Sequence, residues 1–215
     1  MSDPNAFPLP VVDGFELDDE LREILRPGEL MEDEDGRARR LPRFFYEVES
    51  WDQARGLPLT HNFALWEFLD TDVREVERLR RYPRYVPCAI TLLAAHLEVV
   101  RQEVGTLVHI AANGGYRSPG HELSRGASPH MWGTAVNIYR IGSDYIDSQD
   151  SIERYTRITR ELLSGVWIRP YGHGAGYADD HLHIDLGYAG LVPRAAASQE
   201  GTAFAGVGDI EEEAQ

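Results

Sequence analysis

The sequence contains no lysine, only one cysteine and no long apolar run, and two of these absences exclude whole classes of protein. Cys88 is the single cysteine among 215 residues, so an internal disulfide framework is excluded. No stretch of about 18 consecutive apolar residues occurs, so no membrane-spanning helix is predicted. The missing lysine identifies no function.

The N-terminal segment also lacks the basic start and the apolar stretch of a secretory signal. We therefore expect a cytoplasmic protein, with release by a non-classical or phage-type route as the alternative. No internal repeat with a period of about 20–50 residues is visible, which excludes solenoids and propellers. With 42% hydrophobic and 27% charged residues, the chain has the composition of a folded globular protein.

Charge is distributed unevenly along the chain. The net charge of −15 argues against binding to nucleic acid or to anionic lipid. Residues 1–36 hold twelve acids and two arginines, residues 195–215 hold five acids and no base, and residues 37–194 hold 19 of each sign. The sequence therefore predicts an acidic, partly disordered extension over 1–36, a single domain over 37–194 and a disordered acidic tail over 195–215. We expect both ends to be solubilising tails, and docking of a basic partner is the alternative.

Apolar periodicity predicts both helices and strands. Residues 88–104 carry apolar side chains at three- and four-residue spacings and are followed by glycine, as in a helix with a glycine cap. A second helix is predicted over 151–164, with Asp150 and Glu153 as a capping box, and a third over 72–81. Strands are predicted over residues 107–112, 134–140, 166–169 and 182–186. Because helices and strands do not alternate strictly, we predict an α+β fold, a small antiparallel sheet flanked by helices.

In the segment HLHIDLG, polar and apolar side chains alternate as in a half-buried strand. The alternation places His181, His183 and Asp185 on one face and Leu182 and Ile184 on the other. Two imidazoles suit a transition metal such as zinc, and a nearby carboxylate orients a ring through its second nitrogen. A polar edge strand that carries histidines by chance is the structural alternative.

A second group of polar side chains is predicted at SPHMWGTAVNIYR. His130 lies in a loop, and Asn137 lies on the strand that follows, facing away from Val136 and Ile138. We therefore expect His130 and Asn137 to meet over one cleft. Upstream, Arg117 follows a strand and a double glycine, where a fixed guanidinium can grip a carboxylate or a polarised carbonyl.

Together these motifs resemble the zinc D-Ala-D-Ala peptidases, a family that includes VanX-type dipeptidases, VanY-type carboxypeptidases and peptidoglycan L,D-endopeptidases. The family pattern is a GYRS-type segment, then S-x-H-x-x-G-x-A-x-D, then a final H-x-D or H-x-H on a strand. HNFALWEFL also resembles the opening of the carboxypeptidase subgroup. The corresponding residues are 115–118, Ser128, His130, Gly133, Ala135, Asn137, His181, His183 and Asp185. Three ordered motifs within roughly residues 60–190 make the resemblance more specific than any one of them.

The resemblance implies a hedgehog/DD-peptidase-like fold and a zinc site formed by His130, Asn137 and His183. The family has an aspartate at the position of Asn137. An amide oxygen brings no negative charge, so with this departure the resemblance implies weakly held zinc. Asp179 and Asp180 are alternative sources of a carboxylate, although their loop position favours solvated acids.

The resemblance also implies roles for four further residues. His181 would be the general base, Arg117 would stabilise an oxyanion or hold the substrate carboxylate, and Ser128 would contribute a hydrogen bond. Asp185 would orient a metal ligand without touching the metal. The implied substrate is a peptide that contains D-amino acids, in peptidoglycan or its precursors, and the implied activity is that of a D,D-carboxypeptidase, a dipeptidase or an L,D-endopeptidase.

Two functions therefore stay open. One is a zinc-dependent peptidase of bacterial or phage type that acts on D-alanine-containing peptides. The other is a catalytically impaired or repurposed member of the same fold, which binds a peptide without hydrolysing it because Asn137 weakens the metal site. An intracellular dipeptidase, a released phage-type lysin and a cytoplasmic protein without a role at the cell wall all agree with the sequence.

Overall fold

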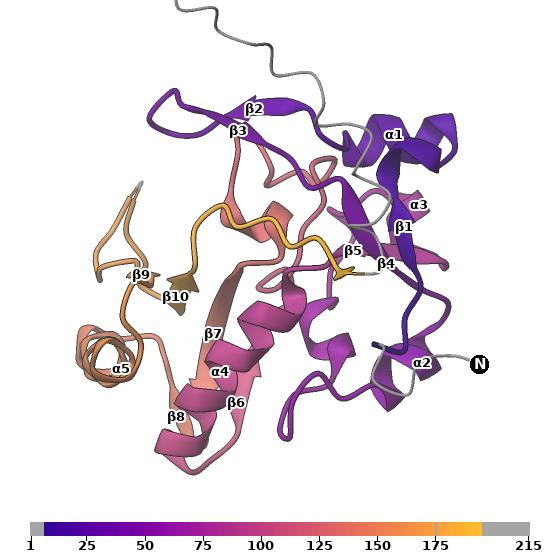
Figure 1. The fold of residues 1–215 in the computed structure, drawn as a ribbon. Helices are drawn as coiled ribbons and strands as arrows, with labels where there is room; N and C mark the ends of the chain where they lie inside the picture. The colour runs from indigo at the N-terminus through magenta and orange to yellow at the C-terminus, as the bar shows by residue number, and fades with distance from the viewer. Residues whose placement is uncertain (1–6, 175, 195–215) are drawn as a thin grey trace, which may run out of the picture.

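The structure is a computed structural model that describes residues 7–174 and 176–194. The described chain is a mixed α/β fold in which helices pack against small antiparallel sheets, in agreement with the predicted class (Figure 1). Its strands are β1 Val11–Asp13, β2 Leu30–Glu32, β3 Ala38–Arg40, β4 Phe44–Val48, β5 Arg84–Pro87, β6 Val108–Ile110, β7 Ala135–Ile141, β8 Asp144–Tyr145, β9 Trp167–Ile168 and β10 Leu182–Asp185. Its helices are α1 Asp19–Leu25, α2 Trp51–Gly56, α3 Glu77–Arg80, α4 Ile90–Val104 and α5 Gln149–Leu162, with 3-10 turns η1 Gly14–Glu16, η2 Leu65–Phe68 and η3 Pro129–Trp132.

The largest sheet contains all four predicted strands. Its strand order is β6-β7-β10-β9, with β8 paired to β7, and every pairing is antiparallel. A second sheet has the order β1-β4-β5, and β2 and β3 form a separate hairpin. β6 and β9 are shorter than predicted, at three and two residues.

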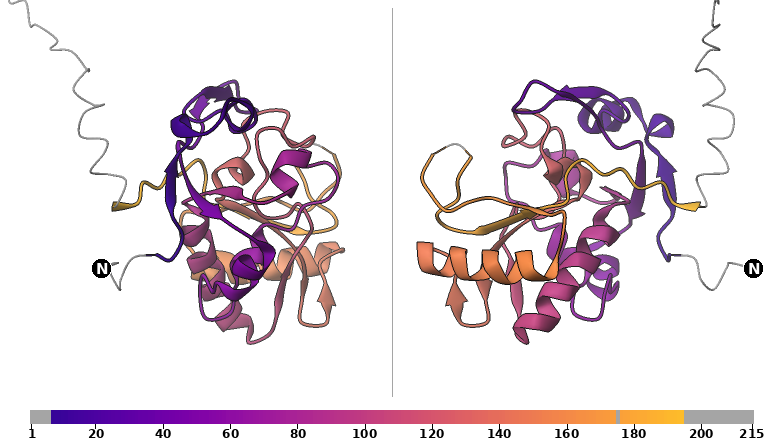
Figure 2. Two further views of the ribbon diagram at one scale, coloured as in Figure 1. Left: turned by 90° about the vertical axis from the view of Figure 1, so that its right-hand side faces the viewer. Right: turned by 60° about the vertical axis from the view of Figure 1, so that its left-hand side comes forward.

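Helices α4 and α5 cover the apolar face of the largest sheet (Figure 2). Val136 and Ile138 of β7 and Leu182 and Ile184 of β10 are completely buried there, in one core with Leu93 of α4. The sheet therefore has one apolar face against helices, which leaves its other face for polar side chains. None of the described helices is both long and apolar enough to cross a membrane.

The predicted helices α4 and α5 both exist, and the cap of the second is corrected. α4 ends at Gly105, whose φ of 63° is the left-handed conformation of a glycine cap. α5 starts earlier than predicted, because Ser148 and not Asp150 caps it. The Ser148 hydroxyl accepts the backbone N–H of Ser151 at 3.3 Å, and Ser151 takes the place of the predicted Glu153 in the capping box.

The helix predicted over residues 72–81 is reduced to α3. Asp72 starts a turn instead, in which its carboxylate accepts the backbone N–H of Arg74 at 2.9 Å, a local bond that competes with helix formation. Glu75 then points inwards, and its carboxylate accepts the hydroxyl of Ser118 at 2.6 Å and the backbone N–H of Ser118 at 3.1 Å. These contacts tie the segment to the GYRS loop.

The predicted domain boundary at residue 36 is also corrected. This residue lies in the turn between β2 and β3, and β1 pairs with β4 in the three-stranded sheet. Leu21 and Leu25, one helical turn apart on α1, are each 1% exposed and belong to one cluster with Phe45. Residues 7–36 therefore belong to the folded body despite their acidity, whereas residues 1–6 and the tail predicted over 195–215 lie outside the described residues.

Leu25→Ala tests whether the acidic N-terminal segment is part of the core. We expect it to lower the free energy of unfolding by about 2–5 kcal/mol, because a buried leucine leaves a cavity when truncated. Leu30→Ala is the control, since Leu30 is 56% exposed and its truncation is expected to cost less than about 0.5 kcal/mol. Chemical denaturation measures both, and equally small effects would show that α1 does not pack on the body.

Candidate functional site

Strand register gathers polar side chains on the face of the largest sheet that α4 and α5 leave open. Asn137 of β7 pairs with His183 of β10, and the backbone N–H of Arg169 donates to the carbonyl of His183 at 3.1 Å. Ile168 and Ile184 are paired and buried in the core, so Arg169 and His183 share the opposite face. Asn137, His183 and Arg169 therefore form one row across the sheet.

A second row lies beside the first. Asp185 is paired with the small Ala135 on one side and with Trp167 on the other. The indole ring of Trp167 meets the imidazole of His183 edge to face, with 5.5 Å between the ring centroids. His183 is therefore surrounded by an amide, a carboxylate, a guanidinium-bearing residue and an aromatic ring.

His130 reaches this face from the loop before β7. It lies in η3, and its ring centroid is 5.2 Å from that of His183. Burial, and then the positive charge of Arg117, lowers the pKa of His130 well below 6.5, so the ring is neutral. Its Nδ1–H donates to the carbonyl oxygen of Gly115 at 2.8 Å. Because a carbonyl only accepts, the lone pair of His130 is on Nε2.

The double glycine before the GYRS loop permits the close approaches on which His130 depends. A Cβ at Gly115 would lie 2.3 Å from the carbonyl oxygen of Phe68, which also accepts the backbone N–H of Tyr116 at 2.8 Å. A Cβ at Gly114 would lie 2.8 Å from the carbonyl oxygen of Asn137. Only glycine fits between these backbone atoms, so both positions require a residue without a Cβ.

His183 is buried, and each of its ring nitrogens faces a polar atom. Nε2 lies 3.2 Å from Oδ2 of Asp185, and Nδ1 lies 2.7 Å from Oδ1 of Asn137. Burial lowers the pKa of His183 despite the nearby carboxylate, so the contact with Asp185 is a hydrogen bond of a neutral ring and not an ion pair. An ionised carboxylate only accepts, which puts the proton on Nε2 and the lone pair on Nδ1, facing Asn137.

His181 directly precedes β10 and lies near His183, with 6.5 Å between the ring centroids. Its Nδ1 is 2.6 Å from Oδ1 of Asp180, to which it donates. Its Nε2 is buried and has no hydrogen-bond partner among the residues that the structure describes. An imidazole oriented by a carboxylate, with an unused lone pair, is the arrangement of a general base.

Two arginines bring positive charge to the imidazoles. The backbone N–H of Arg117 donates to the carbonyl of His130 at 3.3 Å, which fixes where this side chain starts. Burial, and then the charges of Arg169 and Arg74, lowers the pKa of Arg117 to about 10. The positive charges of Arg117 and Arg169 each lower the pKa of His130. The guanidinium groups therefore lie close enough to the imidazoles to influence chemistry there.

His183, Asp185 and the β9 residues beside them border a cleft of about 400 Å³. The lining includes Ser128, Trp167, Arg169, His183 and Asp185, together with residues 33–35 and Arg39 of the β2–β3 hairpin. Asp33 is engaged within the hairpin, since its carboxylate accepts Nε–H of Arg39 at 2.7 Å. The acidic turn that the sequence predicts to be a solvated linker therefore borders the candidate site.

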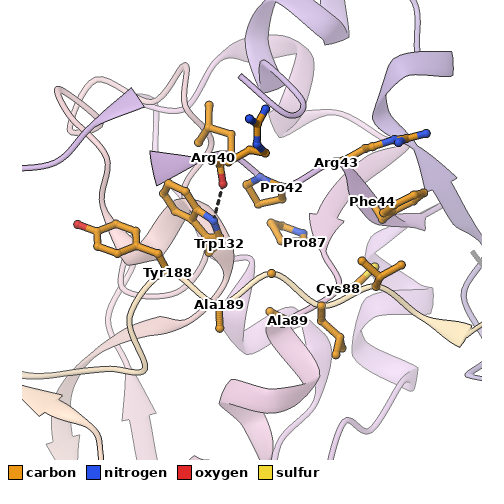
Figure 3. A pocket seen from close by; sticks show the side chains of 14 residues that line it. Arg40, Pro42, Arg43, Phe44, Pro87, Cys88, Ala89, Trp132, Tyr188 and Ala189 are labelled. Atoms are coloured by element: carbon orange, nitrogen blue, oxygen red, sulfur yellow. Dashed lines mark hydrogen bonds between the residues drawn. The ribbon is translucent and has the colours of Figure 1, made fainter. Parts of the chain in front are cut away.

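A second pocket, of about 200 Å³, lies beside Trp132 and Tyr188 (Figure 3). The indole N–H of Trp132 donates to the carbonyl oxygen of Arg40 at 3.1 Å and closes one side (Figure 3). Cys88 lines this pocket, but burial raises the pKa of its thiol to about 12, so a thiolate nucleophile is not available. The cleft at His183 is therefore the better candidate for a functional site.

The donor atoms at and around His183 fit zinc as a weak site. Nε2 of His130, Nδ1 of His183 and Oδ1 of Asn137 are suitable ligand atoms, but all three are neutral. Two ligands of a tetrahedral zinc ion are about 3.3 Å apart. Nδ1 and Oδ1 lie only 2.7 Å apart, so metal binding requires a small outward rotation of the amide. Asp179 and Asp180 do not supply the missing carboxylate, because they bond to the rings of His173 and His181.

Neither a cluster of metal-binding side chains nor a similarity to a known protein identifies a metal for this chain. Within residues 7–174 and 176–194, no group of three or more His, Cys, Asp and Glu side chains is arranged to hold a metal ion. A scan against protein-family models and searches of curated proteins and of solved structures found no match to this chain.

The structure brings the predicted site residues into one region. His183 contacts both Asn137 and Asp185, and the rings of His130 and His181 lie near it. Ser128 lines the cleft, and the backbone of Arg117 bonds to that of His130. Sequence reasoning missed Trp167 and Arg169, although their strand was predicted. The alternation in VWIR was the available signal, since it places both side chains on the face opposite to Ile168.

Gly115→Ala tests the close approach that positions His130. We expect a loss of about 1–3 kcal/mol in the free energy of unfolding, because the new methyl group overlaps the Phe68 backbone. Gly56→Ala in α2 is the matched control, since a Cβ there meets nothing within 4 Å. NMR of the imidazole protons should show a shift of the His130 signals only in Gly115→Ala. Unchanged stability and an unchanged His130 spectrum in that variant would contradict the packing described.

Proposed function

We propose that this protein is a zinc-dependent peptidase of the D-Ala-D-Ala peptidase type, with the hedgehog/DD-peptidase fold, acting on D-alanine-containing peptides of peptidoglycan type. One observation carries the proposal. His130 and His183 each have one ring nitrogen fixed by an acceptor and the other unprotonated, 5.2 Å apart at the ring centroids. Fixing the second nitrogen of an imidazole is how proteins orient metal-binding histidines.

His130, His183 and Asn137 would hold the metal, and Asp185 and the carbonyl of Gly115 would orient the two rings. Bound zinc would polarise the scissile carbonyl and make water a better nucleophile. Because the three ligands are neutral, the charge of the ion would not be reduced by the protein, while its affinity would be lower than with a carboxylate ligand.

His181 and Arg117, near the two imidazoles, supply acid–base and electrostatic functions. His181 accepts a proton from the attacking water at Nε2, because Asp180 holds its Nδ1–H and leaves Nε2 free. The protonated ring then returns this proton to the leaving amine. Arg117, partly buried beside His130, stabilises the negative charge that develops on the carbonyl oxygen.

Asn137→Asp tests the weak third ligand. We expect zinc affinity to rise about tenfold or more, since a carboxylate adds a charge at the position that now offers an amide. Isothermal titration with ZnCl₂ measures the dissociation constants of wild type and variant. Gln149→Glu is the control, because it adds the same charge at an exposed position on α5. Equal affinities for wild type and Asn137→Asp would show that residue 137 does not bind the metal.

A metal-free peptide-binding protein is the second candidate, and the amide of Asn137 favours it. A half-turn of this amide places its NH₂ group where Oδ1 now lies, 2.7 Å from Nδ1 of His183. The NH₂ group can then donate to Nδ1. Asn137 then donates to His183, and His183 donates to Asp185, so every member is satisfied without a metal. An aspartate at position 137 could not donate in this way. Failure to bind zinc in the titration above would favour this function.

His181→Ala separates catalysis from metal binding. We expect hydrolysis of D-alanyl-D-alanine to fall by roughly 10²–10⁴-fold while zinc content stays unchanged, because the base is lost and the ligands are kept. His173→Ala is the matched control, since His173 forms a similar pair with Asp179 on an exposed loop. D-alanine release and metal analysis are the two measurements. Loss of zinc would make His181 a ligand, and unchanged turnover would remove it from the mechanism.

A further inference from the structure

Arg169 has a place in the cleft that the proposed chemistry does not use. It lies in the row formed by Asn137 and His183, and it lines the cleft together with Trp167. Its guanidinium carbon is 5.7 Å from the centroid of the Trp167 ring, so the two side chains form a cation–π interaction.

The charge of Arg169 has no carboxylate partner in the described part of the chain. Its Nε–H is buried without an acceptor, and no ion pair of its guanidinium is formed among residues 7–174 and 176–194. Asp185, the carboxylate of the second row, accepts instead from Nε2–H of His183 and from the backbone N–H of Gly187 at 3.0 Å. A partly buried cation with an unused donor is costly unless a ligand completes it.

Arg117 likewise forms no ion pair with a carboxylate in the described part of the chain. Its guanidinium makes no hydrogen bond to the described residues, and it lies near enough to Arg169 for the two charges to repel each other. The positive charge of Arg117 therefore adds to that of Arg169 and favours an anion near Arg169.

We propose that Arg169 forms a subsite for the free α-carboxylate at the C-terminal end of the bound peptide. This inference rests on the proposed function, and it selects among the activities that the function leaves open. A planar carboxylate matches the two-donor edge of a guanidinium, whereas an internal peptide bond brings no charge. The protein therefore acts at peptide ends, as a carboxypeptidase or dipeptidase, and not as an endopeptidase. Arg169 is a specificity-determining residue, and the row of Asn137, His183 and Arg169 sets the distance from the free carboxylate to the reacting bond.

The test compares D-alanyl-D-alanine with D-alanyl-D-alaninamide, which differ in the terminal charge alone. Binding of both to the full-length protein as purified is measured by isothermal titration, and D-alanine or D-alaninamide release is followed in parallel. We expect wild type to bind the acid at least about tenfold more tightly than the amide. Arg169→Gln should bind the acid about tenfold more weakly and leave the amide unchanged. Arg169→Lys, which keeps the charge and loses the planar fork, should fall between them.

Arg157→Gln is the matched control, because Arg157 is an exposed arginine on α5, and it should keep the preference of wild type. Equal affinities for acid and amide in wild type, binding of neither, or an unchanged preference in Arg169→Gln would each overturn the subsite. The two proposals fail separately. Preference for the acid without any hydrolysis in the presence of zinc would retain the subsite and overturn the peptidase, whereas equal hydrolysis of both would retain the peptidase and overturn the subsite.

Discussion

The antiparallel register between β7 and β10 is the constraint on which the candidate site depends. Successive side chains of a strand point to opposite faces, so the pairing that puts Val136 and Ile138 into the core with Ile184 and Leu182 also puts Asn137 next to His183. A slip of β10 by one residue would bury His183 among apolar side chains and expose Leu182 and Ile184. Core packing therefore holds the polar row in place, without any interaction specific to the site.

The same burial determines the protonation of the site. His130 and His183 lose more by desolvation of a charged ring than they would gain from neighbouring groups, so both rings are neutral and each uses its single N–H on one fixed acceptor. Asn137 is compatible with two states of the site, since its amide oxygen can face a metal ion or, after a half-turn, its NH₂ group can donate to His183 without a metal. Asp185 serves His183 in both states.

Loops far apart in the sequence supply the remaining geometry. The carbonyl of Gly115 orients His130 only because Gly114 and Gly115 lie against the backbones of Asn137 and Phe68. Ser118, three residues later, is completely buried on the Glu75 carboxylate. The GYRS loop is therefore held at both ends, and the start of the Arg117 side chain is fixed between them. The β2–β3 hairpin adds a border of acidic residues from the N-terminal segment.

The sequence by itself determined four strands of the largest sheet, the faces of His183 and Asp185 and the helix that ends at Gly105, because alternation and capping are local properties of a few neighbouring residues. The prediction for the N-terminal segment was wrong, because it was based on charge composition and not on side-chain packing. The acidic residues 7–36 contain Leu21 and Leu25, whose burial depends on Phe45 and cannot be read from net charge. Only the tertiary structure decided that Arg169 and Trp167 join the site, since the strand pairing between β9 and β10 is long-range and no local pattern records which strand will be the neighbour.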